Sequence, residues 1–368
     1  MSEEASVIVW ADPLRDFCAL VFEKMDVPPD DAAVTADVLV AANLRGIDSH
    51  GVARLKRYVD GLRDGVMVAR PNIEVVHETP ATALVDGGAG LGQPVGVRGM
   101  KLAIKKAQEM GIGFVAVRNS NHYGIAGYYS MMALEQEMIG ISMTNAAVLV
   151  VPTFGKDAVL GTNPISVAAP AGQERPFVLD MATSVVTRGK LEEYDRQGRP
   201  LPLSWATDER GVPTSDAARV LRNMLARAGG GILPLGGAYE EDGGHKGYGL
   251  AFLVDILCGV LPGAGYATTI YPKTPEGKPL PADVGHFFGA IRVDAFRPLD
   301  EFKATMDDII RRLKDSAKAE GADRIYIHGE KEFEEEERRR RDGIPLHPKT
   351  VAMMQQIARE LGVEYDLE

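Results

Sequence analysis

A run of short strand-like segments with little helix between them constrains the fold most. Between residues 147 and 182 four apolar stretches follow one another in quick order: AVLVVP, DAVLG, ISVAAP and PFVLDMA. Short apolar runs bounded by glycine, proline or polar residues are typical of strands. A doubly wound parallel sheet would place a helix between successive strands, so this arrangement predicts an α+β fold instead.

Helices are predicted before and after this region. Apolar residues recur at about 3.6-residue spacing over 12–25 and 30–44, with acidic residues in each first turn, which predicts two N-terminal helices. The nearly all-apolar stretch 247–261 predicts a buried helix. The segment EEEERRRR at 334–341 predicts a solvated helix with four Glu-to-Arg pairs at i,i+4 spacing. Residues 195–243 are rich in Gly, Pro and charged residues, which predicts a long excursion, that is, an extended irregular segment between regular elements.

The composition excludes several classes of protein. The 368 residues carry 41 Lys plus Arg against 52 Asp plus Glu, a net charge of −11, and form no basic patch, so we expect no nucleic-acid partner. No apolar run is long enough to span a bilayer, and the acidic start does not resemble a signal peptide. Cys18 and Cys258 each lie in an apolar stretch, which predicts buried reduced thiols. We therefore expect a globular cytoplasmic protein with no membrane partner.

A histidine, an arginine and a tyrosine recur at helical spacing in SHGVARLKRY. On a helix His50, Arg54 and Tyr58 stand at i, i+4 and i+8 and share one face. Arginine holds a carboxylate through two parallel hydrogen bonds, and histidine exchanges a proton near neutral pH. The three residues therefore predict a site for a small carboxylate substrate, although the same spacing also suits an exposed helix without a function.

Two further segments carry candidate site residues. His122 follows the strand-like GFVAVR and precedes a predicted helix, and functional residues often lie in such connections. In GGHKGYG, glycines flank Lys246 at the start of a helix. Free N–H groups and the positive end of the helix dipole favour an anion there, most naturally a phosphate. A simple helix cap is the alternative interpretation of this segment.

One glycine pattern competes with these candidates. Gly90, Gly92 and Gly96 form GxGxxxG between a strand-like run and a helix, as in a dinucleotide-binding Rossmann unit. The sequence before it begins with helices and the sequence after it lacks repeated βαβ alternation, so we do not assign a Rossmann site. The sequence contains no HExxH, CxxC or GxSxG, so we predict neither a metal site nor a hydrolase of those types.

Several longer segments together resemble the malate/L-lactate dehydrogenase family of the second type. This group includes sulfolactate and ureidoglycolate dehydrogenases and some diketogulonate and cyclic-imine reductases. The matching stretches are LRGIDSHGVARLKRYVDGLRDG, NSNHYGIAGYYSMMALEQEMIGISMTN, VLGTNPISVAAP, FVLDMATSVVTRGKLE, LPLGGAYEEDGGHKGYGLAFLVDILCGVL and IYIHGEKE. The resemblance implies a non-Rossmann NAD(P)-binding fold around a largely antiparallel sheet, and a homodimer. It implies helical substrate-side parts at 1–75 and 299–368 that pack together, with the NAD(P)-binding domain over 76–298.

The resemblance also implies roles for individual residues. His122, His50, Arg54 and Tyr58 would face the substrate, with His122 as the proton carrier. The cofactor, NAD or NADP, would lie against ten residues in three segments: Asp180, Met181, Ala182 and Thr183; His245, Lys246 and Gly247; and His328, Gly329 and Glu330.

The predicted reaction is a hydride transfer between the nicotinamide and C2 of a small 2-hydroxy or 2-oxo acid, malate-like or lactate-like. Arg54 would hold the carboxylate of this substrate. Two alternatives stay open: reduction of a cyclic imino acid by the same residues, and a protein that binds or hydrolyses a phosphate ligand without a redox role. The acidic AYEEDGG before His245 leaves NAD and NADP both open.

Overall fold

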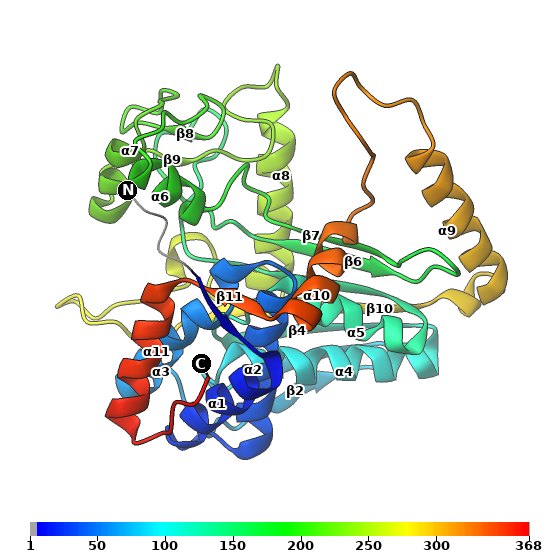
Figure 1. The fold of residues 1–368 in the computed structure, drawn as a ribbon, viewed down its shortest axis with the longest axis horizontal. Coiled ribbons are helices and arrows are strands. Elements are labelled where there is room, and N and C mark those ends of the chain that lie inside the picture. Colours follow the sequence, from blue (N-terminus) through cyan, green and yellow to red (C-terminus); the bar gives the residue numbers. More distant parts are fainter. Residues whose placement is uncertain (1–5, 368) are drawn as a thin grey trace.

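A seven-stranded sheet runs through the middle of the computed structural model, which describes residues 6–367 (Figure 1). Its strands are β2 (Glu74–Glu78), β3 (Thr82–Asp86), β4 (Ile112–Ser120), β5 (Met138–Thr144), β6 (Ile165–Ala169), β7 (Phe177–Met181) and β10 (Val284–Arg292). The order across the sheet is β2-β3-β4-β10-β5-β6-β7, and every neighbouring pair is antiparallel except β3 with β4. The α+β class and the largely antiparallel sheet are confirmed.

Helices cover both faces of this sheet. The α-helices are α1 (Ala11–Glu23), α2 (Pro29–Leu44), α3 (Leu55–Arg63), α4 (Gly92–Met110), α5 (Ala126–Met132), α6 (Arg188–Arg196), α7 (Ala217–Ala226), α8 (Gly244–Asp255), α9 (Leu299–Lys314), α10 (Glu330–Asp342) and α11 (Pro348–Leu361). Successive side chains of a strand point to opposite faces. Phe288 of β10 therefore packs with α4 and α5 on one face, and Phe287 packs with α8 on the other.

Shorter elements complete the chain. The 3₁₀ turns are Asp48–His50, Val52–Arg54, Leu134–Gln136, Ala267–Thr269 and Val293–Ala295, and α8 continues into a π-helical turn, Ile256–Val260. The small strands are β1 (Val7–Val9), β8 (Ala206–Thr207), β9 (Gly231–Ile232) and β11 (Ile344–Leu346). Within residues 6–367 no helix is both long and apolar enough to cross a membrane. Cys18 and Cys258 are buried and unbridged, as predicted.

The two ends of the described chain share a helical core. Helices α1, α2 and α3, drawn in blue in Figure 1, lie beside the red α11, and β1 pairs antiparallel with β11. Leu14, Phe22, Leu39 and Met354 are among the buried side chains of this core. Helix α9 lies apart from it, at the far side of the sheet, where Asp307 accepts hydrogen bonds from three backbone N–H groups of the turn 172–174. The domain boundaries themselves stay a prediction.

Two of the four segments that predicted strands are not strands. ISVAAP and PFVLDMA contain β6 and β7, but AVLVVP and DAVLG make isolated bridges, for example between Val150 and Leu160. Phe154, between these two segments, has a backbone φ of 66°, in the left-handed region. The chain turns sharply there, so the two segments fold against one another and against Ile232 rather than joining the sheet.

The apolar helix predicted over 247–261 forms, but the prediction that all of its apolar side chains are buried is wrong. Val254 and Cys258 are buried against the sheet. Five large side chains on the other side are between 39% and 59% exposed: Phe252, Leu253, Ile256, Val260 and Leu261. We call these five residues the α8 apolar face. An apolar patch of this kind commonly marks a contact surface.

The charged segment EEEERRRR lies in α10. The prediction that this helix is only exposed to solvent is wrong. In the described chain two of the four predicted i,i+4 pairs form, Glu335 with Arg339 and Glu336 with Arg340. Arg339 is buried, and its Nη1 lies 2.6 Å from Oδ1 of Asp48. The helix therefore ties the C-terminal part of the chain to the loop that contains His50.

Candidate active site

A cleft of about 270 Å³ brings together segments from across the chain. Its lining includes three arginines and two histidines, and among the described residues that line it there is no Asp or Glu. We call it the cationic cleft and define it by these five residues: His50, Arg54, Arg57, His122 and Arg188. The structure therefore brings His50, Arg54 and His122 together, as predicted from the sequence.

The local structure around His50 differs from the prediction. His50, Arg54 and Tyr58 do not share one continuous helix, because two 3₁₀ turns precede α3 and Gly51 between them is extended (φ −83°, ψ −150°). A Cβ at Gly51 would collide with the side-chain carbonyl of Asn43, so only glycine allows this close approach. The turns still bring His50 and Arg54 to the cleft, whereas Tyr58 is fully buried behind it.

His122 lies in the connection between β4 and α5, where the sequence placed it. Its ring stacks on the ring of His50, with centroids 5.6 Å apart and planes at 21°. The Tyr58 hydroxyl lies 2.7 Å from Nδ1 of His122, and the backbone N–H of Gly124 approaches the same nitrogen at 3.4 Å. Nδ1 is therefore engaged within the protein, and Nε2 is the nitrogen available to a ligand in the cleft.

The GxGxxxG pattern is explained by packing rather than by a nucleotide. A Cβ at Gly92, the first residue of α4, would lie 2.6 Å from the carbonyl carbon of His122. A Cβ at Gly96 would lie 2.6 Å from the Tyr129 ring. These glycines let α4 pack closely against the loop that carries His122, so they support the candidate site from outside it.

Burial keeps both histidines of the cleft in their neutral form. Burial, together with the smaller effects of the Arg54 and Arg57 charges, lowers the pKa of His50 to about 4. The pKa of His122 lies well below its ordinary value for the same reasons, burial first and then Arg57 and His50. At neutral pH the two imidazoles are therefore uncharged, and the positive charge of the cleft comes from its arginines.

A second hollow, of about 250 Å³, contains other predicted residues. We call it the Asp180 recess, and its lining is Arg45, Ile47, Val178, Asp180, Tyr326, Ile327, His328, Gly329, Lys331 and Glu332. Asp180 accepts a hydrogen bond from the backbone N–H of Gly127 at 2.7 Å. Asp180 is exposed, but the protein atoms near its carboxyl partly displace water, and this desolvation raises its pKa to about 6.

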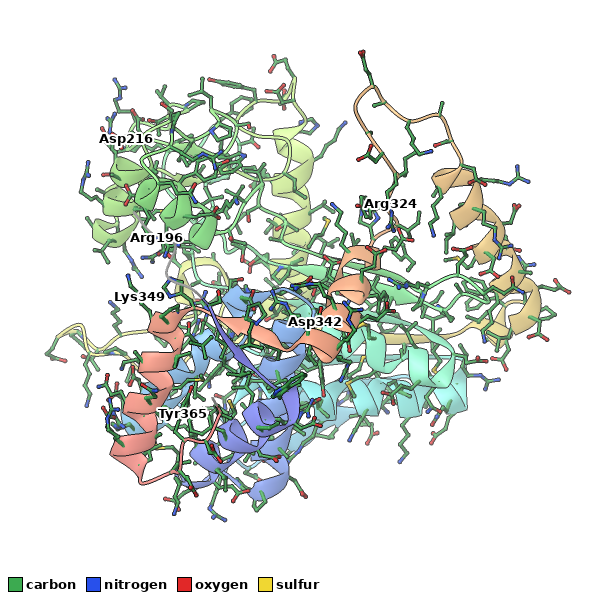
Figure 2. All side chains as sticks on the ribbon, in the orientation of Figure 1. Arg196, Asp216, Arg324, Asp342, Lys349 and Tyr365 are labelled. Carbon is green, nitrogen blue, oxygen red and sulfur yellow. The ribbon has the colours of Figure 1, made fainter. Side chains whose placement is uncertain are left out.

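Two of the residues implied for the cofactor are engaged within the protein. The Thr183 hydroxyl donates to two backbone carbonyls of the segment before β6. Glu330 is buried and pairs with Lys314 at 2.6 Å and with Arg324 at 3.1 Å. Arg324 lies on the segment that returns from the extended loop after α9 toward α10 (Figure 2). Met181 and Ala182 are partly buried.

The segment around Lys246 begins α8, as predicted, but lines neither hollow in the described chain. His245 and Lys246 are exposed, and Gly247 packs against Leu235. The preceding loop folds back, so the N–H of Gly244 donates to the Tyr239 carbonyl and the N–H of Lys246 to that of Gly243. Two of the N–H groups expected to face an anion are thus used inside the loop, and the Lys246 ammonium remains.

Comparison with known proteins identifies the family. The sequence profile of the malate/L-lactate dehydrogenases matches residues 9–355. The chain belongs to this family. Malate dehydrogenase from Pyrococcus horikoshii is 49% identical over 362 residues, which are 98% of either chain. Its solved structure superposes with a TM-score of 0.88 at 47% identity, over 99% of this chain and 98% of that one.

Other members of the malate/L-lactate dehydrogenase family act on related substrates. L-sulfolactate dehydrogenase from Methanocaldococcus jannaschii is 41% identical over 347 residues, 94% of this chain and 95% of that one. A solved Δ1-piperideine-2-carboxylate reductase from Pseudomonas syringae superposes with a TM-score of 0.81 at 27% identity, over 96% of this chain and all of that one. The resemblance found in the sequence is confirmed, and the chain is a dehydrogenase of an NAD(P)-dependent family that acts on small 2-hydroxy or 2-oxo acids.

The Asp180 recess has groups that suit part of a dinucleotide. The Tyr326 ring is exposed, with Arg324 and Lys331 within 4.2 and 4.4 Å of its centroid. Ribose hydroxyls need acceptors such as the Asp180 carboxylate, and phosphates need cations such as Lys331 and Arg45. The residues present therefore fit an NAD(P) cofactor.

Sequence reasoning missed two residues of the cationic cleft, Arg57 and Arg188, and also Tyr271, which lines the same hollow. Arg57 stands three residues after Arg54, and helical spacing alone would have placed it on the same side of α3. Arg188 and Tyr271 come from distant segments, and no local signal points to them.

Proposed function

We propose that the cationic cleft binds the 2-hydroxy or 2-oxo acid, with Arg54 on its carboxylate and His122 as the proton carrier. The arrangement around His122 carries this proposal. Tyr58 holds Nδ1 at 2.7 Å, so Nε2 is left for the substrate in the same cleft as the Arg54 guanidinium. Nε of Arg54 donates to the Ser49 carbonyl at 2.7 Å, which orients the remaining N–H groups for a carboxylate.

On oxidation His122 begins neutral, because burial lowers its pKa well below the ordinary value. Oxidation uses the tautomer in which Nδ1 carries the proton and donates it in a hydrogen bond to the Tyr58 hydroxyl oxygen. Nε2 then has a free lone pair and accepts the proton of the substrate hydroxyl as the C2–H bond breaks and the C2–O bond becomes a carbonyl. A nicotinamide held by the residues proposed below for the cofactor would supply the acceptor of the C2 hydride in this direction and its donor on reduction. The proton left on His122 completes the balance and passes to solvent.

Reduction requires the opposite state of His122. The imidazolium must donate its proton to the carbonyl oxygen, yet burial and the charge of Arg57 disfavour that form in the free protein. The anionic substrate offsets this effect, because its carboxylate brings negative charge beside the ring. Tyr58 keeps the ring oriented through Nδ1, and the stacked His50 closes one side of it.

For the cofactor we propose the Asp180 recess and the exposed Lys246, which together include residues implied by the resemblance. Asp180, His328 and Gly329 line the recess, and the ammonium of Lys246 is available to a phosphate. Either NAD or NADP is compatible with this proposal. Reduction of a cyclic imino acid is the second candidate, and it is favoured by the shared fold of the piperideine-carboxylate reductase. Offering ketone and imine substrates side by side separates the two.

We also propose a homodimer, and the α8 apolar face supports it. Five large apolar side chains on one side of a helix lose contact with water when a second copy covers them. Sedimentation velocity of the whole chain measures this assembly directly. The cytoplasmic location expected from the sequence stays a prediction.

The roles of the two histidines are tested by a matched pair of variants. His122→Asn removes the proton carrier and is expected to lower kcat by about 10²–10⁴-fold with cofactor affinity preserved. His50→Asn removes the stacked ring and is expected to have a much smaller effect on kcat. The opposite ranking, with His122→Asn active and His50→Asn inactive, would assign the proton to His50 instead.

A further inference from the structure

The side chain of Gln93 is buried without a hydrogen-bond partner. Gln93 is the second residue of α4 and is fully buried, and it is not among the described residues that line the cationic cleft or the Asp180 recess. Within residues 6–367 neither Oε1 nor Nε2 of its amide forms a hydrogen bond. Removing an amide from water without such a bond costs free energy, so this group needs a reason that packing alone does not give.

The start of α4 packs against the segment that carries His122. A Cβ on Gly92 would lie 2.6 Å from the carbonyl oxygen of His122. Leu91, just before the helix, packs in the same buried core as Tyr58. Gln93 therefore extends from a turn that lies against the backbone of His122 and joins the core around Tyr58.

The polar group beside the Gln93 amide is the Tyr58 hydroxyl. Tyr58 is fully buried, and its hydroxyl lies 2.7 Å from Nδ1 of His122. Burial raises the pKa of Tyr58 to about 12, and the Gln93 amide is among the groups that oppose this rise. An amide has this effect only on a hydroxyl that is close to it, so the two groups are neighbours.

The number of hydrogens in this group decides which end of the amide must face Tyr58. When Nδ1 of His122 donates to the Tyr58 oxygen, as oxidation requires, the O–H of Tyr58 needs a separate acceptor. Oε1 of Gln93 is a buried acceptor without a partner in the described chain. If the NH₂ end faced Tyr58 instead, the hydroxyl would donate to Nδ1. Nε2 would then carry the proton and could not accept one from the substrate.

We infer that Gln93 is a positioning residue, whose Oε1 accepts a hydrogen bond from Tyr58 and so keeps His122 in the tautomer with a free Nε2. The inference rests on the proposed function, in which His122 carries the proton. The arrangement suits both directions of the reaction, because the imidazolium needed for reduction also donates through Nδ1. Gln93 therefore affects the proton transfer and not the binding of substrate or cofactor.

The first test is a matched pair of substitutions in the full-length protein. Gln93→Met removes the amide and keeps the length of the side chain, whereas Gln108→Met makes the same change at an exposed position of α4. Both variants are compared with the wild type in the reduction of oxaloacetate and of pyruvate, with NADH and with NADPH. We expect Gln93→Met to lower kcat about tenfold with KM unchanged within about twofold, and Gln108→Met to change neither.

A second background separates this role from a structural one. Tyr58→Phe removes the hydroxyl that links Gln93 to His122, so adding Gln93→Met to it should lower kcat by less than about twofold more. The same loss of kcat in both backgrounds would show that Gln93 acts through packing, and it would overturn the inference. Thermal melts show whether each variant folds.

The third test measures the tautomer and needs no activity. In ¹⁵N NMR spectra of protein labelled with ¹⁵N-histidine, the signals of His122 are those missing from His122→Asn. We expect Nε2 to be the unprotonated nitrogen of His122 in the wild type, and both tautomers to be present in Gln93→Met.

The spectra also separate a failure of this inference from a failure of the proposed function. An unprotonated Nε2 in the wild type and equally in Gln93→Met would overturn the inference and leave the proposed function standing. A wild type that reduces neither acid with either cofactor would remove the proposed function, and the spectra would still decide whether Gln93 sets the tautomer of His122.

Discussion

The cationic cleft and the Asp180 recess share one segment of chain, yet desolvation shifts the pKa values of their ionisable groups in opposite directions. Residues 45–50 separate them, with Arg45 on the recess and His50 on the cleft. In the cleft the pKa of His50 falls to about 4, and in the recess the pKa of Asp180 rises to about 6. In both places desolvation favours the neutral form, but that form is the free base of a histidine and the protonated acid of an aspartate.

The two hollows also differ in the charge that remains. Among the described residues, the cleft lining contains three arginines and no carboxylate, whereas the recess lining contains Arg45 and Lys331 together with Asp180 and Glu332. The cleft therefore has a net positive charge and favours an anion. The recess contains both cationic and anionic side chains, so it provides hydrogen-bond donors and acceptors. This difference explains why we place the acid substrate in the first and a part of the cofactor in the second.

Helix α10 connects the two hollows through residues 45–50. Arg339 binds Asp48 at 2.6 Å, and the Arg45 guanidinium lies 4.7 Å from the centroid of the Phe333 ring. Arg45 also pairs with Glu336 at 3.4 Å. Both ends of the shared segment are thus held by a helix almost 300 residues away in the sequence, which fixes the cleft and the recess relative to one another.

Arg54→Lys is expected to give the largest difference between the effects on substrate KM and on cofactor Kd. Lysine keeps the charge but loses the planar fork, so KM for the substrate should rise about 10–100-fold, and any fall in kcat reports lost alignment. Cofactor Kd, measured by NAD(P)H fluorescence, should stay within about twofold, because Arg54 does not line the recess. A comparable loss of cofactor affinity would mean that the two ligands meet at Arg54.

A smaller effect is expected where the cofactor phosphates bind. Lys246→Ala removes a charge-assisted contact and should raise cofactor Kd roughly tenfold while substrate KM changes little. Lys331→Ala is the matched control, because it removes the same group from the Asp180 recess. If Lys331→Ala weakens cofactor binding and Lys246→Ala does not, the phosphate contact belongs to the recess rather than to the start of α8.

The smallest effect is a difference in how stability depends on pH. The pKa of Asp180 is about 6 in the fold, above its ordinary 3.8, so its contribution to the free energy of unfolding is present at low pH and lost as pH rises to 6. The pKa of His50 is about 4, below its ordinary 6.5, so its contribution is present above pH 6.5 and lost as pH falls to 4.

The two groups should therefore show opposite behaviour in thermal melts. After allowing for solvent screening, Asp180→Asn should raise Tm by about 1–3 °C at pH 7 and have no effect near pH 4. His50→Gln should leave Tm unchanged at pH 7 and raise it by a similar amount near pH 4. An increase in Tm at the same pH for both variants would contradict the opposite pKa shifts of the two groups.

Several helices and strands, and the family, follow from local patterns of residues. Apolar spacing located α1 and α2, the short runs at 165–169 and 177–181 became β6 and β7, and His122 lies between a strand and a helix as predicted. These features depend on residues a few positions apart, which set helix and strand preference directly. The motifs around His50 and Lys246 carried the family resemblance, because they contain residue types in a fixed local order.

The assembly of the site depends on contacts between segments that are far apart in the sequence. Arg188 and Tyr271 reach the cleft from segments far from Arg57, and Arg339 fixes Asp48 across most of the chain. The exposed α8 apolar face had the same sequence signature as a buried helix. Periodicity reports which residues share a side of one element, but packing between distant elements decides which side meets solvent, a ligand or another helix. That packing forms only when the helical core and the sheet come together, so no local pattern contains it.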